Sequence, residues 1–404
     1  MPHEFASVLI QVIAVLLGAK LLGAFANRLG MPAVLGELLA GVVLGASCLN
    51  VLHPDDPIMH ALSELGVLIL LFEIGLHTDL RSLAKVGGTA STVGLVGVAL
   101  PFALGFWVSR ALGVDTLPAI VCGAALTATS IGISARVLSD LGQLDSPEGQ
   151  VVLGAAVLDD VVGLIILSVV SGLAAGGHVD ALGVARTAAV AVGFIVAALI
   201  VGGLIAGPAF RQVSKMERDG GLMGPMGLAF ALAMAYLADA AGSAMIVGAF
   251  AAGLVLHGRP QRKAIEQSVT TLGHYLVPIF FATVGASVDV KSLAGADILM
   301  IGGALVVVGV LAKVAAGYAP WWFRGRKLMV GVAMVPRGEV GLIFAQVGLA
   351  AGALDVRLFS ALTLMVMVTT FIAPPVLGRL TARGAAPAAE SGVADLVSGA
   401  AKGE

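Results

Sequence analysis

The chain has 404 residues, of which 58% are apolar and only 12% are charged, and its mean hydropathy is +1.02. A water-soluble domain does not have this composition, so we predict an integral membrane protein. The net charge of −2 balances 23 basic against 25 acidic side chains, which indicates no nucleic-acid partner. The 54 glycines favour helices in close contact within lipid, and not a β-barrel.

Apolar stretches long enough to cross a membrane recur along the whole chain. A hydrocarbon core about 30 Å thick needs roughly 20 helical residues. The polar residues 239–243 separate the eighth stretch from the ninth, which favours an odd number of spans over an even one. The fold class is therefore all-α, with about thirteen transmembrane helices. The predicted spans are 6–26, 31–51, 59–77, 86–110, 116–140, 147–175, 182–206, 221–240, 244–257, 268–287, 296–320, 328–350 and 356–380.

Lys and Arg residues are distributed unequally between the two sides of these spans. Cytoplasmic loops retain basic residues, so the richer side is predicted to be inside, with the N-terminus outside and the C-terminus inside. Residues 384–404 lack apolar periodicity and are predicted to form a disordered cytoplasmic tail after a transmembrane domain of residues 1–383. The richer side holds Arg28, Arg81, Lys85, Arg136, Arg211, Lys215, Arg218, Arg259, Arg262, Lys263, Arg324, Arg326, Lys327, Arg379, Arg383 and Lys402, against Arg110, Arg186, Lys291 and Arg357 on the other.

Charged residues inside the spans are costly to bury and indicate function. Asp159 and Asp160 lie about twelve residues into the sixth span, which places them about 18 Å deep. Neighbouring helix positions differ by about 100°, so the two carboxylates face different surroundings. Two close carboxylates in a low dielectric do not both ionise cheaply, so a proton and a metal cation would compete for the site. Such competition is the chemistry of an antiporter.

Lys313 interrupts an apolar run in the eleventh span, about 15 Å deep and level with the two aspartates. It is predicted to be their counter-ion. A buried lysine can release its proton when its partner changes state, which an arginine effectively cannot do. A permanently charged structural bridge is the alternative interpretation. Glu37 and Glu73 also lie inside spans, where a buried ion pair and a functional role are equally compatible with the sequence.

Two spans are interrupted in a matching way. The fifth contains LTATSIGIS at residues 126–134, and the twelfth contains MVPRGEVGLI at residues 334–343. Broken backbone in a membrane is tolerated only where it is buried in protein or lines a cavity, and paired breaks in two halves of a chain indicate an inverted-repeat transporter site. Arg337 and Glu339 would either neutralise the half-helix ends or contact the ion. Gly41 and Gly45 form a GxxxG pattern that we interpret as helix packing.

Several of these motifs occur together in one known family. ATSIGISARVL, AAVLDDVVGLI, PIFFATVGASVD, the lysine of the eleventh span and VPRGEVGLI resemble the bacterial NapA-type sodium/proton antiporters, in the CPA2 branch of the monovalent cation:proton antiporter superfamily. The resemblance covers residues 5–380. It implies a homodimer in the bacterial inner membrane, an elevator mechanism, and two discontinuous helices that cross.

The resemblance also implies domains and residue roles. A dimerisation part would cover residues 1–80 and 221–290, a core part 86–175 and 296–380, and a linker helix 182–206. The double aspartate is typical of electrogenic members, which exchange sodium or lithium for protons without a cofactor. The implied site comprises Asp160 and Asp159 for the cation and proton, Lys313 as the partner of Asp159, and Thr127, Thr129, Ser130, Arg337 and Glu339 around the crossing.

The alternative functions are a potassium/proton antiporter, an intramembrane aspartyl protease and a cation channel. A potassium/proton antiporter of the same superfamily remains open, because the same oxygen ligands serve sodium, lithium and potassium. An intramembrane aspartyl protease would carry its two aspartates on separate helices in YD and GxGD contexts, which this sequence does not contain. A cation channel would not require a titrating Asp–Lys pair. We therefore expect a transporter and no enzymatic activity.

Overall fold

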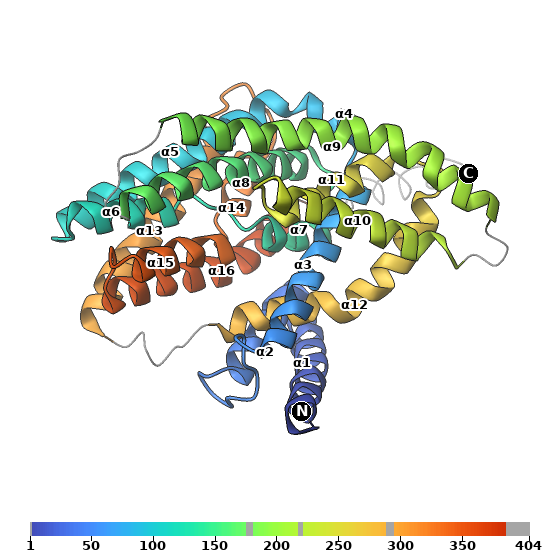
Figure 1. Ribbon diagram of the computed structural model, residues 1–404. Helices are drawn as coiled ribbons and strands as arrows, with labels where there is room; N and C mark the ends of the chain where they lie inside the picture. The colour runs from blue at the N-terminus through green and yellow to red at the C-terminus, as the bar shows by residue number, and fades with distance from the viewer. Residues whose placement is uncertain (1, 175–180, 217–220, 288–294, 385–404) are drawn as a thin grey trace, which may run out of the picture.

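The computed structural model describes residues 2–174, 181–216, 221–287 and 295–384, and its regular elements there are all helices (Figure 1). In those ranges, nine helices are long and apolar enough to cross a membrane, and further short apolar helices lie between them. Taken with the two interrupted spans, they correspond to the thirteen predicted spans, and the all-α membrane fold is confirmed. The predicted tail lies outside the described residues, except for Gly384 at the end of the last helix.

One group of helices packs around a long central helix, α3. Helices α11 and α12 both pack along α3, while α1 and α2 pack on each other and on α12 (Figure 1). Asp56 fixes the start of α3 by accepting hydrogen bonds from the amides of Ile58 and Met59, with Pro57 in the first helical position. The group comprises α1 (Pro2–Arg28), α2 (Ala33–Leu44), α3 (Pro57–His77), α10 (Met223–Ala240), α11 (Met245–His257) and α12 (Arg262–Ala286).

Close backbone contacts hold this group together. A Cβ atom on Gly41 would lie 2.0 Å from the carbonyl oxygen of Ala282, and one on Gly285 would lie 2.1 Å from that of Leu38. Any side chain at these positions would therefore force α2 and α12 apart. This contact confirms that the Gly41–Gly45 pattern serves helix packing.

A second group surrounds the aspartate-bearing helix α8. Helix α5 packs on α6, α8 and α13, and α13 packs on α14 and α16. The group comprises α5 (Gly87–Ala111), α6 (Thr116–Ala125), α7 (Ile131–Asp140), α8 (Pro147–Ala174), α13 (Ala296–Tyr318), α14 (Lys327–Ala333), α15 (Glu339–Ala350) and α16 (Val356–Gly384).

The two interruptions predicted from the sequence are present. The fifth span divides into α6 and α7, with residues 126–130 outside either helix, and the twelfth divides into α14 and α15, with residues 334–338 outside. Gly132, which we placed in the first break, lies inside α7, because Ser130 already begins that helix by accepting from the amide of Ile133. Arg136, which is among the basic residues of the richer side, also lies inside α7.

Two helices differ from the prediction at the membrane surface. Helix α9 (Ala181–Met216) continues ten residues past the predicted end of its span, and it packs against α8, α10 and α11, so it contacts both groups. The short helix α4 (Leu80–Lys85) was not predicted. It begins at Asp79, which accepts hydrogen bonds from the amides of Arg81 and Ser82.

Candidate ion-binding site

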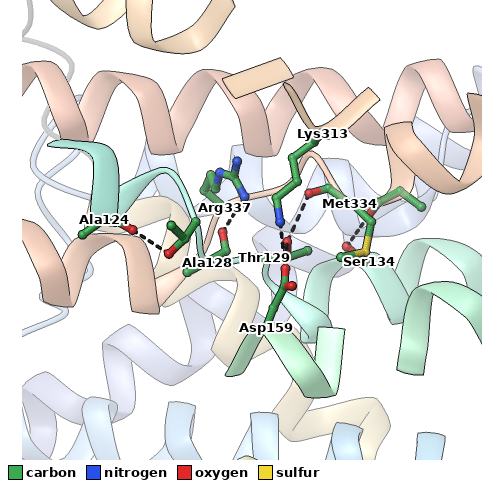
Figure 2. A network of polar contacts seen from close by, with 10 residues as sticks. Ala124, Ala128, Thr129, Ser134, Asp159, Lys313, Met334 and Arg337 are labelled. Atoms are coloured by element: carbon green, nitrogen blue, oxygen red, sulfur yellow. Dashed lines mark hydrogen bonds and ion pairs between the residues drawn. The ribbon is translucent and has the colours of Figure 1, made fainter. Parts of the chain in front are cut away.

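Asp159 and Asp160 project from the middle of α8 in different directions. The side chain of Asp159 is completely buried and points to the place where the two broken spans meet (Figure 2). Asp160 borders a space between α8, α7, α3 and α11, and 7% of its surface is exposed. The helical offset of about 100° thus divides the two carboxylates between two environments.

Lys313 on α13 forms a buried ion pair with Asp159. Its Nζ lies 2.7 Å from Oδ2 of Asp159, and both side chains are 0% exposed. Figure 2 shows the lysine reaching the carboxylate from the opposite side of the crossing. At such depth neither charge is stable without the other, so the pair either persists as a unit or changes protonation as a unit.

Thr129 contributes a second contact to the same carboxylate oxygen. Its Oγ1 donates to Oδ2 of Asp159 over 2.7 Å and lies 3.3 Å from the carbonyl oxygen of Met334. Residue 129 is in the extended break between α6 and α7, which allows its side chain to reach α8. A single hydroxyl therefore connects both broken spans to the aspartate (Figure 2).

The two breaks are joined directly by hydrogen bonds. The amide of Ser130 donates to the carbonyl of Pro336 over 2.9 Å, and Oγ of Ser134 donates to the carbonyl of Ala333 over 2.7 Å. These bonds satisfy backbone groups that the missing helical turns would otherwise leave unpaired in lipid. Gly338 permits the approach, because a Cβ there would lie 2.7 Å from Oγ of Ser130.

Arg337 lies in the second break and is 0% exposed. Its Nη1 donates to the carbonyl of Ala128 over 2.6 Å, at the C-terminal side of α6, while its own carbonyl accepts from the hydroxyl of Thr370. The contact with Ala128 places a fixed positive charge at the negative end of a half-helix. This geometry favours the neutralising role over direct contact with the ion.

The remaining predicted residues take different positions. The hydroxyl of Thr127 donates to the carbonyl of Ala124, in the last turn of α6, over 2.7 Å, so its contact is local. The hydroxyl of Ser130 caps α7. Glu339 begins α15, but its side chain lies outside the part of the chain that the structure describes.

Asp160 is enclosed by apolar side chains from both helix groups. The space beside it has a total volume of about 160 Å³, with no room for a water-sized sphere. An ion bound at this carboxylate would therefore lie mainly among apolar side chains. The enclosing side chains are Leu71, Ile131, Val157, Ile246, Val247 and Phe250.

Two larger cavities lie beside α3. One is toward the start of this helix and the other toward its end, as seen from the space beside Asp160. One of about 440 Å³ is lined by His60, Glu64 and Leu68, and it reaches Ile246, which also closes the space beside Asp160. The other, of about 190 Å³, is lined by Glu73, His77 and residues of α7. On α3, Leu71 follows Leu68 of the first cavity and precedes Glu73 of the second, so the space beside Asp160 has one cavity toward each end of this helix, which we call the two vestibules.

Contacts between α7 and the first helix group were not foreseen from the sequence. Asp140 forms a 3.0 Å salt bridge with Arg136 and lies near the backbone amides of Ala33 and Val34 at the start of α2. Glu37, 2% exposed, lies near the same arginine. The position of Glu37 inside an apolar span marked it in the sequence as unusual, but nothing in the sequence indicated that it would lie near Arg136.

Comparison with known proteins gives the family. The profile described as "Sodium/hydrogen exchanger, transmembrane" matches residues 12–383, which include every predicted site residue. The chain belongs to the sodium/hydrogen exchanger family. Its relatives include the high-affinity Na⁺/H⁺ antiporter NhaS3 of Synechocystis sp., 39% identical over 93% of this chain and 90% of that protein. The resemblance found in the motifs is thereby confirmed at the level of a monovalent cation:proton antiporter.

Other members of the exchanger family also match this chain over most of its length. An Na⁺/H⁺ antiporter of Enterococcus hirae is 31% identical over 92% of this chain and 98% of its own length. The Na⁺/H⁺-K⁺ antiporter GerN of Bacillus cereus is 32% identical over 91% and 94%. The solved structure of the sodium proton antiporter MjNhaP1 from Methanocaldococcus jannaschii superposes with a TM-score of 0.67 over 94% of this exchanger and 98% of that chain, at 16% identity, and so shows the shared fold.

Proposed function

We propose that this exchanger is a secondary active antiporter that moves sodium or lithium in one direction and protons in the other. The observation that carries the proposal is the buried Lys313–Asp159 pair beside Asp160, where two broken helices cross. A structural ion pair would not require a second carboxylate at the adjoining position. Competition between a cation and protons for one enclosed carboxylate couples the two fluxes.

Asp160 is the proposed cation site. It lies at the junction of the two helix groups, where a shift of one group against the other would expose it to either vestibule. The protonated carboxyl group releases its proton when a cation takes its place, and a proton returns to the carboxylate when the cation leaves. Burial prevents the bare negative charge from crossing, because an uncompensated charge in this environment is strongly disfavoured.

Asp159 and Lys313 are proposed to carry the second proton. The lysine releases its proton when Asp159 turns from it toward the incoming cation, and regains it when the pair forms again. Two protons then exchange for one monovalent cation, which makes transport electrogenic. One net charge contributes about 2.3 kcal/mol per 100 mV of membrane potential, a bias of nearly fifty-fold.

The movement is proposed to be of the elevator type within a homodimer. The group around α8 (residues 86–175 and 296–380) would be the moving core, the group around α3 (1–80 and 221–290) the dimerisation part, and α9 the linker. Support comes from the packing of α9 against both groups. The proposed location is the bacterial inner membrane, with the N-terminus outside and the C-terminus inside, as the distribution of basic residues predicts.

Potassium is a second candidate cation. The name of the Na⁺/H⁺-K⁺ antiporter GerN includes potassium, and carboxylate, hydroxyl and carbonyl oxygens bind all three alkali cations. Everted membrane vesicles with an acidic interior test both candidates: sodium, lithium or potassium is added, and the loss of the proton gradient is measured. Sodium- or lithium-driven proton release supports the proposal. Proton release by potassium alone would show that potassium, and not sodium or lithium, is the exchanged cation. Cation flux without proton movement would indicate a channel.

A further inference from the structure

A groove lined almost entirely by apolar side chains lies between the two helix groups, on the side of the molecule that α9 crosses. Its volume is about 290 Å³. Helices α5 and α8 form one wall, α11 forms the other, and α9 lies across it. Val157, Leu158 and Val161 come from α8, while Val247, Phe250 and Leu254 come from α11, and Ser91 is the only lining residue with a hydroxyl group.

The groove opens at the lipid-facing surface. Val192 and Val196 of α9 line it and are 53% and 50% exposed, whereas Val161 and Val247 in its depth are 6% and 4% exposed. Within the hydrocarbon layer an open apolar groove contacts lipid chains, because water has no polar partners there.

The end of the groove near α4 carries positive charge. Leu80 and Leu83 of that helix line the groove, while Arg81 and Lys85 of the same helix are exposed. Hydrogen bonds from the hydroxyl of Ser82 and the amide of Arg81 hold the pKa of Asp79 below its usual range. Asp79 therefore stays ionised and caps the start of α4. Helix α4 is thus a small amphipathic element with leucines in the groove and bases at the headgroup level.

We propose that this groove binds one acyl chain of an anionic phospholipid, with the headgroup held by Arg81 and Lys85. The charge of α4 selects the anionic headgroup, and the apolar walls accept the chain. Val157, Val247 and Phe250 line both this groove and the enclosure of Asp160. The bound chain therefore packs against the outer side of the residues that close the ion site.

Photolabelling tests the site in the full-length protein. The wild type is placed in phosphatidylcholine vesicles that contain phosphatidylglycerol with a diazirine on its acyl chain, irradiated, digested and analysed by mass spectrometry. Label is expected on peptides of α5, α8 or α11 that line the groove. Unlabelled phosphatidylglycerol should compete, and added phosphatidylcholine should not.

Two matched pairs of variants separate the chain from the headgroup. Gly87 lines the groove, and a Cβ there meets nothing within 4 Å; the same is true of its exposed neighbour Gly88. Gly87→Leu should reduce the labelling, and Gly88→Leu should leave it unchanged. Arg81→Gln with Lys85→Gln should weaken phosphatidylglycerol labelling about fivefold for each base. Arg211→Gln with Lys215→Gln, on exposed residues of α9, is the control.

The outcomes that overturn the proposal are distinct. Equal labelling by phosphatidylglycerol and phosphatidylcholine probes would show that the site does not select an anionic headgroup. Labelling of the exposed faces of α9 that is as strong as labelling in the groove would show that the groove is not a specific site for the acyl chain. Equal effects of Gly87→Leu and Gly88→Leu on labelling would also show that the groove is not the site of the acyl chain. If either variant fails to fold, competition between lipids in the wild type tests the site instead.

Discussion

Nζ of Lys313 lies 2.7 Å from Oδ2 of Asp159, and neither side chain has any exposed surface. Thr129 donates to that same oxygen, so one carboxylate oxygen receives two donors, one from α13 and one from the break between α6 and α7. Asp160, the next residue, lies toward another set of helices. The two halves of the proposed cycle, cation binding and proton release, thereby occupy adjoining residues with separate surroundings.

Replacing Lys313 tests the origin of the second proton. Lys313→Gln removes a titrating group and keeps a hydrogen-bond donor, so surviving exchange should shift toward one proton per cation and lose its response to voltage. Asp159 is then left without its partner, which should cost about 3–5 kcal/mol of stability. Charge movement on a solid-supported membrane under a sodium gradient measures the first effect, and thermal unfolding the second.

Lys313→Arg serves as the control for that measurement. Arginine keeps the charge but does not release its proton, so it too should transport without voltage dependence while it recovers stability. Undiminished voltage dependence in Lys313→Gln would show that the lysine is a structural bridge.

Thr129 is predicted to matter through its hydroxyl. Thr129→Val keeps the shape but removes the 2.7 Å bond to Asp159, a bond to a charged group that contributes about 1.5–3 kcal/mol. Thr127→Val is the matched change, because its hydroxyl bonds only to Ala124 among the contacts described. We expect the first variant to lower the melting temperature and the apparent sodium affinity of exchange, and the second to change neither by much. Equal effects would contradict the assignment.

Gly338 is predicted to be necessary for the crossing. In Gly338→Ala the new methyl group would lie 2.7 Å from Oγ and 2.8 Å from Cβ of Ser130. Such overpacking typically costs about 1–3 kcal/mol. Exchange in vesicles should fall sharply, and Ser130→Gly on the same chain should restore part of it. Gly303→Ala, where nothing lies within 4 Å, is the control; a tolerated Gly338→Ala would mean that the crossing is loose.

The orientation is tested with single cysteines. Cys48 and Cys122 are first replaced, because both are free thiols. A cysteine at Glu64, in the larger vestibule, should react with a membrane-impermeant maleimide added outside intact cells, whereas one at Ser139, in the smaller vestibule, should react only in everted vesicles. The reverse pattern would invert the topology.

The sequence predicted those features that depend on local polarity. Charges at Asp159, Asp160 and Lys313 are conspicuous in apolar spans, and Pro336 and Gly338 mark a break in any helix. The number and order of the helices follow from apolar length for the same reason. In the structure, Lys313 and Thr129 both contact Asp159.

Features that depend on which helices become neighbours were not predictable. Asp140 lies near the start of α2, and its neighbours Ala33 and Val34 are apolar residues that carry no signal, because it faces their backbone amides. Helix α4 has only six residues, too few for a periodic pattern. Thr127 and Thr129 look alike in sequence, but the exact position of the break directs Thr127 back to the last turn of α6 and Thr129 to Asp159.

The central claim is that Asp160 carries the cation and a proton. Asp160→Asn keeps the shape of the side chain but cannot ionise, and its position at the junction of the helix groups is retained. The measurement is sodium-driven proton movement in proteoliposomes of the purified variant, beside the wild type and with folding checked by thermal unfolding. The account predicts a folded protein in which sodium drives no proton movement; near-native exchange by a folded Asp160→Asn would contradict it.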